Sequence, residues 1–260
     1  MDEQRAAAYL RRIGAARPDR PDPAALRALH LAHLRAVPFE NLSVHLGEDI
    51  VLAPEPLVAK IVDARRGGFC YELNGAFAVL LRTLGYDVEL LACRSFGEGG
   101  ALGPPFDHMA LRVRTGDGAA WLADVGFGRH SHFPLALDSR AEQREPGGVF
   151  RIRPASGGDV DVLRDGQPQY RVEQRARALD DFTATCWWQR TSPLSHFRQS
   201  LVCSRLTADG RVTLSGRTLV STAGGSRRER ELPGPAEVLA AYREHFGIAL
   251  DSEPALAAAP

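Results

Sequence analysis

Apolar residues recur at helical spacing through the first third of the chain, and this pattern predicts a group of helices. The first is expected over residues 6–13. The second begins at Asp22, an N-cap followed by a proline at the first helical position, and ends before Pro38. A third is expected over 57–64. A fourth helix has the strongest apolar pattern and should be buried; it contains Leu73, Phe77, Leu80, Leu81 and Leu84 and is closed by Gly85.

The spacing of apolar residues changes to alternation after Gly85, which predicts a sheet in the middle of the chain. The strands 109–113 and 121–125 are separated by a short turn with two glycines and should pair as a hairpin. A loop rich in glycine and proline, 95–107, precedes this hairpin, and we expect it to border a site. Further strands are expected at 86–92, 150–152, 160–163 and 170–172.

The last third of the chain mixes strands with a helix. Residues 200–206 and 211–220 predict a hairpin that turns at Asp209-Gly210, and a closing helix runs from Pro235 to Phe246. The tail 251–260 should be loose. Helices, then strands, then a mixed end indicate an α+β protein in three consecutive modules, which we place at 1–85, 86–190 and 191–260.

Composition and charge narrow the class of protein. Of the 260 residues, 44% are hydrophobic and 25% are charged, as in an ordinary globular protein. Lys plus Arg number 32 and Asp plus Glu number 32, so no basic field favours nucleic acid or an anionic membrane as a partner. We see no signal peptide and no apolar run long enough to span a bilayer. Four cysteines without close pairing do not form a disulfide framework, and we therefore expect a cytoplasmic protein.

Cys70 is the first candidate for chemistry. The double glycine Gly67-Gly68 brings this cysteine to the first turn of the fourth helix. Unpaired backbone N–H groups and the positive end of the helix dipole favour a thiolate there, which is the nucleophilic form of cysteine. The alternative is an inert, buried core cysteine, which is the commoner fate of a single free thiol.

A nucleophilic cysteine needs a base, and the base needs a group that orients its ring. His108 opens one strand of the central hairpin and Asp124 lies near the end of the other, so pairing of the strands brings them together. Both residues alternate with apolar positions and share one face of the predicted sheet. A solvated polar face is the alternative reading of the same pattern.

Several other motifs carry weaker signals. The Gly126-Phe127-Gly128 loop lets a backbone approach a ligand closely, but it lacks the third glycine of a dinucleotide-binding fingerprint. His130 and His132 have no further ligand at metal-binding spacing, and we expect no metal site. We interpret His30 and His33 as packed or solvated helix positions. Trp187-Trp188 is interpreted as part of the core or of a seam between modules.

Five segments together resemble the arylamine N-acetyltransferases. They occur in the family's order and cover the chain from about residue 5 to residue 250. The segment around the cysteine, Arg66-Gly-Gly-Phe-Cys-Tyr-Glu-Leu-Asn-Gly75, is the most specific. The others are Val37-Pro-Phe-Glu-Asn-Leu42, His108-Met109, Asp124-Val-Gly-Phe-Gly128 and Ser192-Pro-Leu-Ser-His-Phe197.

The resemblance implies a fold, a reaction and a set of site residues. The fold would be a helical bundle, a β-barrel-like domain and an α/β lid, arranged as in papain-like cysteine proteinases. Cys70 would accept the acyl group, His108 would act as its base and Asp124 would orient the imidazole. Acetyl-CoA would be a co-substrate in a double displacement, with no tightly bound cofactor. Gly126, Phe127, Gly128 and Phe197 would lie near CoA, and Phe39, Phe127 and Tyr71 near the arylamine.

Several functions share this arrangement of residues. The expected partners are acetyl-CoA and a small aromatic amine or hydrazine, and the protein would be a monomer or a homodimer. An amide synthase, which forms a macrolactam or amide from a carrier-bound or CoA-bound acyl chain, is the nearest alternative because it uses the same triad. A cysteine protease or transglutaminase-like hydrolase and a catalytically silent binding module are more distant alternatives.

Overall fold

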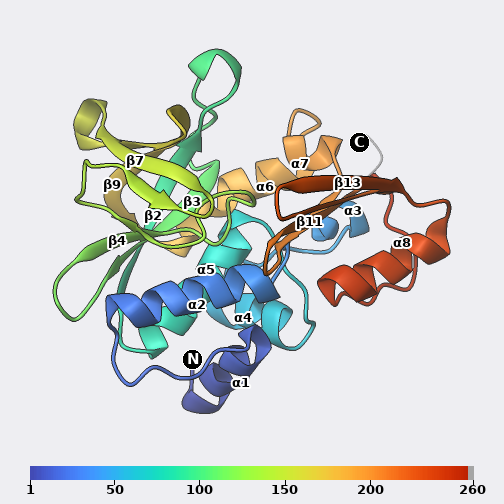
Figure 1. The fold of residues 1–260 in the computed structure, drawn as a ribbon, viewed down its shortest axis with the longest axis horizontal. Helices are drawn as coiled ribbons and strands as arrows, with labels where there is room; N and C mark the ends of the chain where they lie inside the picture. The colour runs from blue at the N-terminus through green and yellow to red at the C-terminus, as the bar shows by residue number, and fades with distance from the viewer. Residues whose placement is uncertain (257–260) are drawn as a thin grey trace.

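The N-terminal helices form one side of the molecule. A computed structural model describes residues 1–256, and Figure 1 shows the first helices packed together below the central sheet. The four predicted helices are present as α1 (Glu3–Ile13), α2 (Pro23–Ala36), α4 (Pro54–Val62) and α5 (Cys70–Thr83). Asp22 caps α2 by accepting a hydrogen bond from the N–H of Ala25 (2.8 Å), as its position predicts. A short helix that was not predicted, α3, covers Leu42–Leu46.

An antiparallel sheet of eight strands follows and curves strongly, toward a barrel (Figure 1). Its order is β5-β4-β3-β2-β9-β8-β7-β6. The predicted hairpin is confirmed, because β3 pairs with β4 with Leu111 opposite Ala123 and Val113 opposite Trp121. The strands are β2 (Asp87–Ser95), β3 (His108–Arg114), β4 (Ala120–Ala123), β5 (Leu135–Ala136), β6 (Gln143–Glu145), β7 (Gly148–Pro154), β8 (Val160–Arg164) and β9 (Gln167–Arg177).

A second antiparallel sheet, of five strands, lies on the other side of the molecule beside α8 (Pro235–Ala241) (Figure 1). The prediction of one strand over 211–220 is wrong. Gly216, with φ of +55°, makes a turn inside that stretch and divides it into two strands. The closing helix ends, as predicted, just before Gly247, after a wider π-type turn over Tyr242–Phe246. The strands are β1 (Phe39–Glu40), β10 (Val202–Leu206), β11 (Gly210–Ser215), β12 (Thr218–Ala223) and β13 (Ser226–Glu231), in that order.

Two further helices, α6 (Thr183–Thr191) and α7 (His196–Gln199), connect the two sheets along the chain. The interpretation of the tryptophan pair as core is wrong for Trp187, which is 63% exposed on α6. Of the tail expected to be loose, 251–256 form neither helix nor strand, and 257–260 lie outside the described residues.

Buried apolar side chains form three clusters. The first centres on α5 and joins the N-terminal helices to one face of the large sheet. The second fills the inside of that curved sheet. The third lies between the small sheet and α8. Within residues 1–256, none of the helices is both long and apolar enough to cross a bilayer.

Candidate active site

The approach to α5 requires two glycines. A side chain on Gly67 would overlap the carbonyl oxygen of Pro38, and one on Gly68 would overlap the carboxylate of Glu72. Glu72 cannot move aside easily, because it accepts a hydrogen bond from the N–H of Phe69 (3.2 Å) and pairs with Lys60. The double glycine therefore lets the backbone pass close to the fixed carboxylate of Glu72 before the helix begins. It places Cys70 at the first helical position.

Buried ion pairs hold the segment that leads into this turn. The guanidinium of Arg66 donates to Glu40 (2.9 Å) and to Glu48 (3.2 Å), and Glu40 is fully buried. Charges this deeply buried are stable only when they are paired and hydrogen-bonded. The pairs thus tie β1 and the segment just after α3 to the loop in front of Cys70.

His108 and Asp124 lie in direct contact beside the same helix. The Nε2–H of His108 donates to Oδ2 of Asp124 across 2.8 Å, and both side chains are buried. Burial by itself would raise the pKa of Asp124, but the charge and hydrogen bond of His108 outweigh it and hold this pKa well below its ordinary value. Because Nε2 is occupied, Nδ1 is the imidazole nitrogen left for another partner. Phe127 and Tyr170 flank the ring, with centroids 5.0 and 5.1 Å away.

Asn74 joins the helix to this pair, and the sequence reasoning did not single it out. Its Nδ2 donates to Oδ1 of Asp124 (2.9 Å) and to the carbonyl of Met109 (2.6 Å). Its Oδ1 accepts from the N–H of Val125 (2.9 Å). The signal was present, because Asn74 follows Cys70 by four residues and such residues share a helix face.

His30 supports Asp124 from the opposite side. Its Nδ1–H donates to the carbonyl of His132 (2.9 Å), and its Nε2 accepts from the backbone N–H of Asp124 (3.2 Å). Burial lowers the pKa of His30 to about 4, so the ring is neutral at physiological pH. Of the two expected positions, packed or solvated, the structure shows the packed one for His30 and for His33, but the contact with Asp124, 94 residues away, has no signature in the sequence.

The ionisation of Cys70 differs from the expectation. Burial raises the pKa of the thiol well above its ordinary value, and the negative charge of Asp124 adds to this effect. The sulfur lies 3.9 Å from the carbonyl oxygen of Asp107, which suits an S–H donor. A helix N-terminus alone therefore does not make this sulfur a thiolate, and a neighbouring cation is needed.

Cys70 and His108 line one cavity of about 690 Å³. The loop 95–107 forms part of its wall, as expected, and residues from α6 and α7 face it from the other side. Phe39, Gly126, Phe127 and Phe197 line it as well, together with Trp188, Leu194 and His196.

Two of the expected site residues do not line this cavity. The side chain of Tyr71 is fully buried, its hydroxyl donates to the carbonyl of Phe106 (2.6 Å), and its ring packs on Phe69 and Phe182. Gly128 lies behind the cavity wall, where a Cβ would meet the ring of Phe39 at 3.7 Å. The expectation that Tyr71 contacts the acceptor is therefore wrong, because α5 turns its ring into the core.

Metal ligands do not cluster in the part of the chain that the structure describes. His130 is buried between the rings of Phe127, Phe150 and Tyr170, and burial lowers its pKa to about 3. His132 points into a separate cavity.

Comparisons with known proteins identify the class to which this fold and site belong. The family model described as N-acetyltransferase matches residues 22–255. The arylamine N-acetyltransferase of Escherichia coli (strain K12) is 36% identical over 234 residues, which cover 87% of this chain and 82% of that protein. The solved arylamine N-acetyltransferase of M. smegmatis superposes with a TM-score of 0.86 at 36% identity, covering 96% of this chain and 93% of that one.

A second similar structure contains a ligand. The arylamine N-acetyltransferase of Mycobacterium marinum in complex with CoA has a TM-score of 0.85 and 32% identity, and covers 94% of this chain and 92% of that one. The family match and the identities extend over most of the chain. This chain belongs to the arylamine N-acetyltransferase family.

Proposed function

We propose that this protein transfers the acetyl group of acetyl-CoA to arylamines or hydrazines by a ping-pong mechanism through acetyl-Cys70. The observation that carries the proposal is the contact of His108 with a low-pKa Asp124 on the wall of the cavity that also holds the Cys70 thiol. Family membership and the CoA complex of a relative support the same donor.

The first half-reaction needs an ionised sulfur. Because burial opposes a lone thiolate, we infer that the thiol proton passes to Nδ1 of His108, which gives an ion pair that Asp124 stabilises. The thiolate attacks the thioester carbonyl, and backbone N–H groups at the start of α5 can receive the oxyanion. The carbon–sulfur bond to CoA then breaks, and the imidazolium proton goes to the departing sulfur.

The second half-reaction returns the enzyme to its starting state. The nitrogen of the amine attacks the carbonyl of acetyl-Cys70 while His108 accepts its proton. The bond between the acetyl carbon and the Cys70 sulfur breaks, His108 returns the proton to that sulfur, and the acetylated amine leaves. The apolar rings of Phe39, Phe127 and Phe197 around the cavity suit a flat aromatic acceptor.

Mass spectrometry of the intact protein tests this proposal. Incubation with acetyl-CoA in the absence of amine should add one acetyl group, and addition of an arylamine should remove it. Cys70→Ala should abolish the adduct, whereas Cys203→Ala, which removes a buried thiol of the small sheet, should retain it. An unchanged adduct in Cys70→Ala would overturn the assignment of the nucleophile.

An amide synthase is the second candidate, because it uses the same catalytic triad. Rapid turnover of acetyl-CoA with a small arylamine or hydrazine favours the acetyltransferase, and acylation only by a long carrier-bound chain would favour the synthase.

The finer architecture is also our proposal: a papain-like arrangement with modules at 1–85, 86–190 and 191–260. The second apolar cluster lies within 86–190 and the third, apart from Leu42, within 191–260, which supports these two modules.

We further propose a cytoplasmic monomer or homodimer. The four free cysteines, Cys70, Cys93, Cys186 and Cys203, are consistent with a reducing compartment.

A further inference from the structure

Gln189 contributes a buried amide to the wall of the cavity that holds Cys70. It lies on α6, and only 7% of its surface is exposed. The amide has an acceptor, Oε1, and two N–H donors on Nε2, and polar groups this deeply buried normally have hydrogen-bond partners. The partners of its two ends therefore show whether this side chain serves the fold alone.

The oxygen end of the amide is occupied. Oε1 of Gln189 accepts from the hydroxyl of Ser195 across 2.7 Å, and Ser195 is fully buried. The Ser195 oxygen in turn accepts from the backbone N–H of Phe197 (3.2 Å), which caps α7. Because the hydroxyl has one hydrogen and gives it to Gln189, the amide oxygen faces Ser195 and Nε2 lies on the other edge of the amide.

The nitrogen end of the amide has no protein partner. Among residues 1–256, Nε2 of Gln189 meets no hydrogen-bond acceptor, yet it is not sealed from solvent. The open space that Gln189 lines is the Cys70 cavity. A donor left unpaired against an apolar ligand is costly, so a ligand that supplies an acceptor atom at this point is preferred.

The segment that holds the amide also carries a ring of the cavity wall. Phe197 follows Ser195 by two residues and lines the cavity, and the centroid of its ring lies 4.9 Å from that of Phe69, the residue before Cys70. Apolar rings of this kind suit an aromatic acceptor. An arylamine that packs on Phe197 while its amino group reaches Cys70 therefore shares the cavity with the N–H groups of Gln189.

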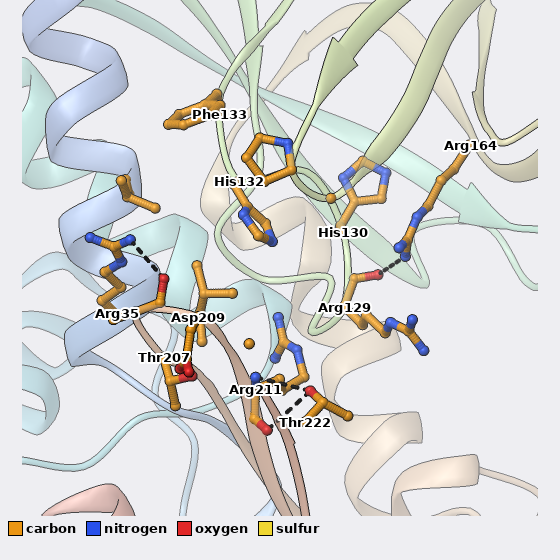
Figure 2. Close-up of a pocket in the computed structure, with 16 residues that line it drawn as sticks. Arg35, Arg129, His130, His132, Phe133, Arg164, Thr207, Asp209, Arg211 and Thr222 are labelled. Carbon is orange, nitrogen blue, oxygen red and sulfur yellow. Dashed lines mark hydrogen bonds between the residues drawn. The ribbon is translucent and has the colours of Figure 1, made fainter. Parts of the chain in front are cut away.

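The charges around the cavity indicate a neutral partner for this amide. Its lining, all within residues 1–256, includes the carboxyl groups of Glu98 and Asp107 but no lysine or arginine. Arginines gather instead around a separate cavity of about 340 Å³, where Figure 2 shows Arg35, Arg129 and Arg211. An anionic substituent in the Cys70 cavity would meet carboxyl groups without a guanidinium or ammonium partner, whereas a neutral oxygen needs only an N–H donor.

We propose that Gln189 is a specificity residue for the amine, and that its Nε2–H groups donate to a neutral carbonyl or ether oxygen on the acceptor, away from the reacting nitrogen. The inference rests on the proposed acetyl transfer and adds a substrate class to it: arylamines whose ring carries such an oxygen.

The test compares two amines of similar shape. 4-Aminoacetophenone has a carbonyl oxygen where 4-isopropylaniline has a methyl group. Gln189→Glu keeps an oxygen for Ser195 but replaces the N–H donors with an acceptor, and Gln189→Met removes both. In each variant the ratio of kcat/KM for 4-aminoacetophenone to kcat/KM for 4-isopropylaniline should fall by about tenfold relative to the native enzyme.

Gln199→Glu is the matched control. Gln199 is exposed on α7, lies outside the lining of the Cys70 cavity, and donates through Nε2 to the carbonyl of Pro193 (2.9 Å). The substitution adds the same charge to the same segment and also disturbs a hydrogen bond there, and it should leave the ratio unchanged. The ratio cancels losses of folded enzyme, so Gln189→Glu tests the proposal even if Gln189→Met folds poorly.

The two amines react with the same acetyl-enzyme, so an effect on the first half-reaction also cancels in the ratio. An unchanged ratio in Gln189→Glu would overturn the inference, and so would an equal fall in Gln199→Glu, because the segment as a whole would then be responsible. Absence of acetyl-enzyme after incubation of the native protein with acetyl-CoA would instead overturn the proposed function.

Discussion

Replacement of His30 by leucine removes two hydrogen bonds that lie directly behind Asp124. The imidazole accepts from the backbone N–H of Asp124 (3.2 Å) and donates to the carbonyl of His132 (2.9 Å), and the site is fully buried. Each partner left without a hydrogen bond costs about 1–3 kcal/mol, so the free energy of unfolding should fall by roughly 2–6 kcal/mol.

The effect on activity should be separate from the effect on stability. Asp124 would keep its side-chain bonds to Asn74 and to the N–H of Gly126 but lose the one that fixes its own backbone. A displacement of about 1 Å at a catalytic group can cost on the order of 100-fold in rate. We therefore expect kcat for arylamine acetylation in His30→Leu to fall by about 10- to 100-fold, measured at a temperature where the variant is folded.

His33 provides the matched control. It lies one turn further along α2, is also fully buried, and shares a hydrogen bond with the hydroxyl of Tyr9 (3.0 Å) rather than with Asp124. Urea unfolding should show a loss of stability in both His30→Leu and His33→Leu, whereas kcat should fall only in the former. Equal kcat values in the two variants, or a native kcat in His30→Leu, would refute a positioning role for His30.

Three further predictions follow from the same contacts. Gly126→Ala should lower kcat at least tenfold, because its Cβ would lie 2.7 Å from the Cα of Cys70 and must displace the loop; steady-state kinetics measure this. Lys60→Met should lower the free energy of unfolding by about 3–5 kcal/mol in urea titrations, because the buried carboxylate of Glu72 loses its cation. The free energy of unfolding should be highest above about pH 6.5 and should decline as the pH falls toward 4. The reason is that three histidines stay buried and neutral in the folded protein but bind protons in the unfolded chain. Urea titrations between pH 4 and 8 should show this slope, and a flat profile would contradict it. Those histidines, with pKa values lowered by burial to about 4, 3 and 3, are His30, His33 and His130.

The sequence predicted those elements whose apolar pattern matches their burial. Helix α5 is buried along nearly its whole length, and Met109, Leu111 and Val113 of β3 all belong to the apolar cluster around it, so both left clear patterns. Strand β13 is exposed at every position and forms through backbone pairing with β12, so its sequence has no apolar periodicity from which a strand could be predicted. Helix α6 was missed although it contributes to the cavity wall.

The candidate site was predicted only in part, for a similar reason. The spacing along two paired strands was enough to bring His108 to Asp124. The contacts of Asn74 and His30 depend on how α5 and α2 pack against the sheet, which local pattern does not determine. The ionisation of Cys70 also depends on tertiary burial, which raises the pKa of its thiol and opposes the effect of the helix dipole.

The interior position of Lys60 has a practical consequence for protein chemistry. It is the only lysine in the 260 residues, and its ammonium group is paired with Glu72 inside the molecule. The molecule therefore offers reactive thioesters a single lysine amine, and that amine is mostly buried and paired with a carboxylate. Mass spectra of the acylated protein should accordingly be free of the lysine background that often obscures a single labelled thiol.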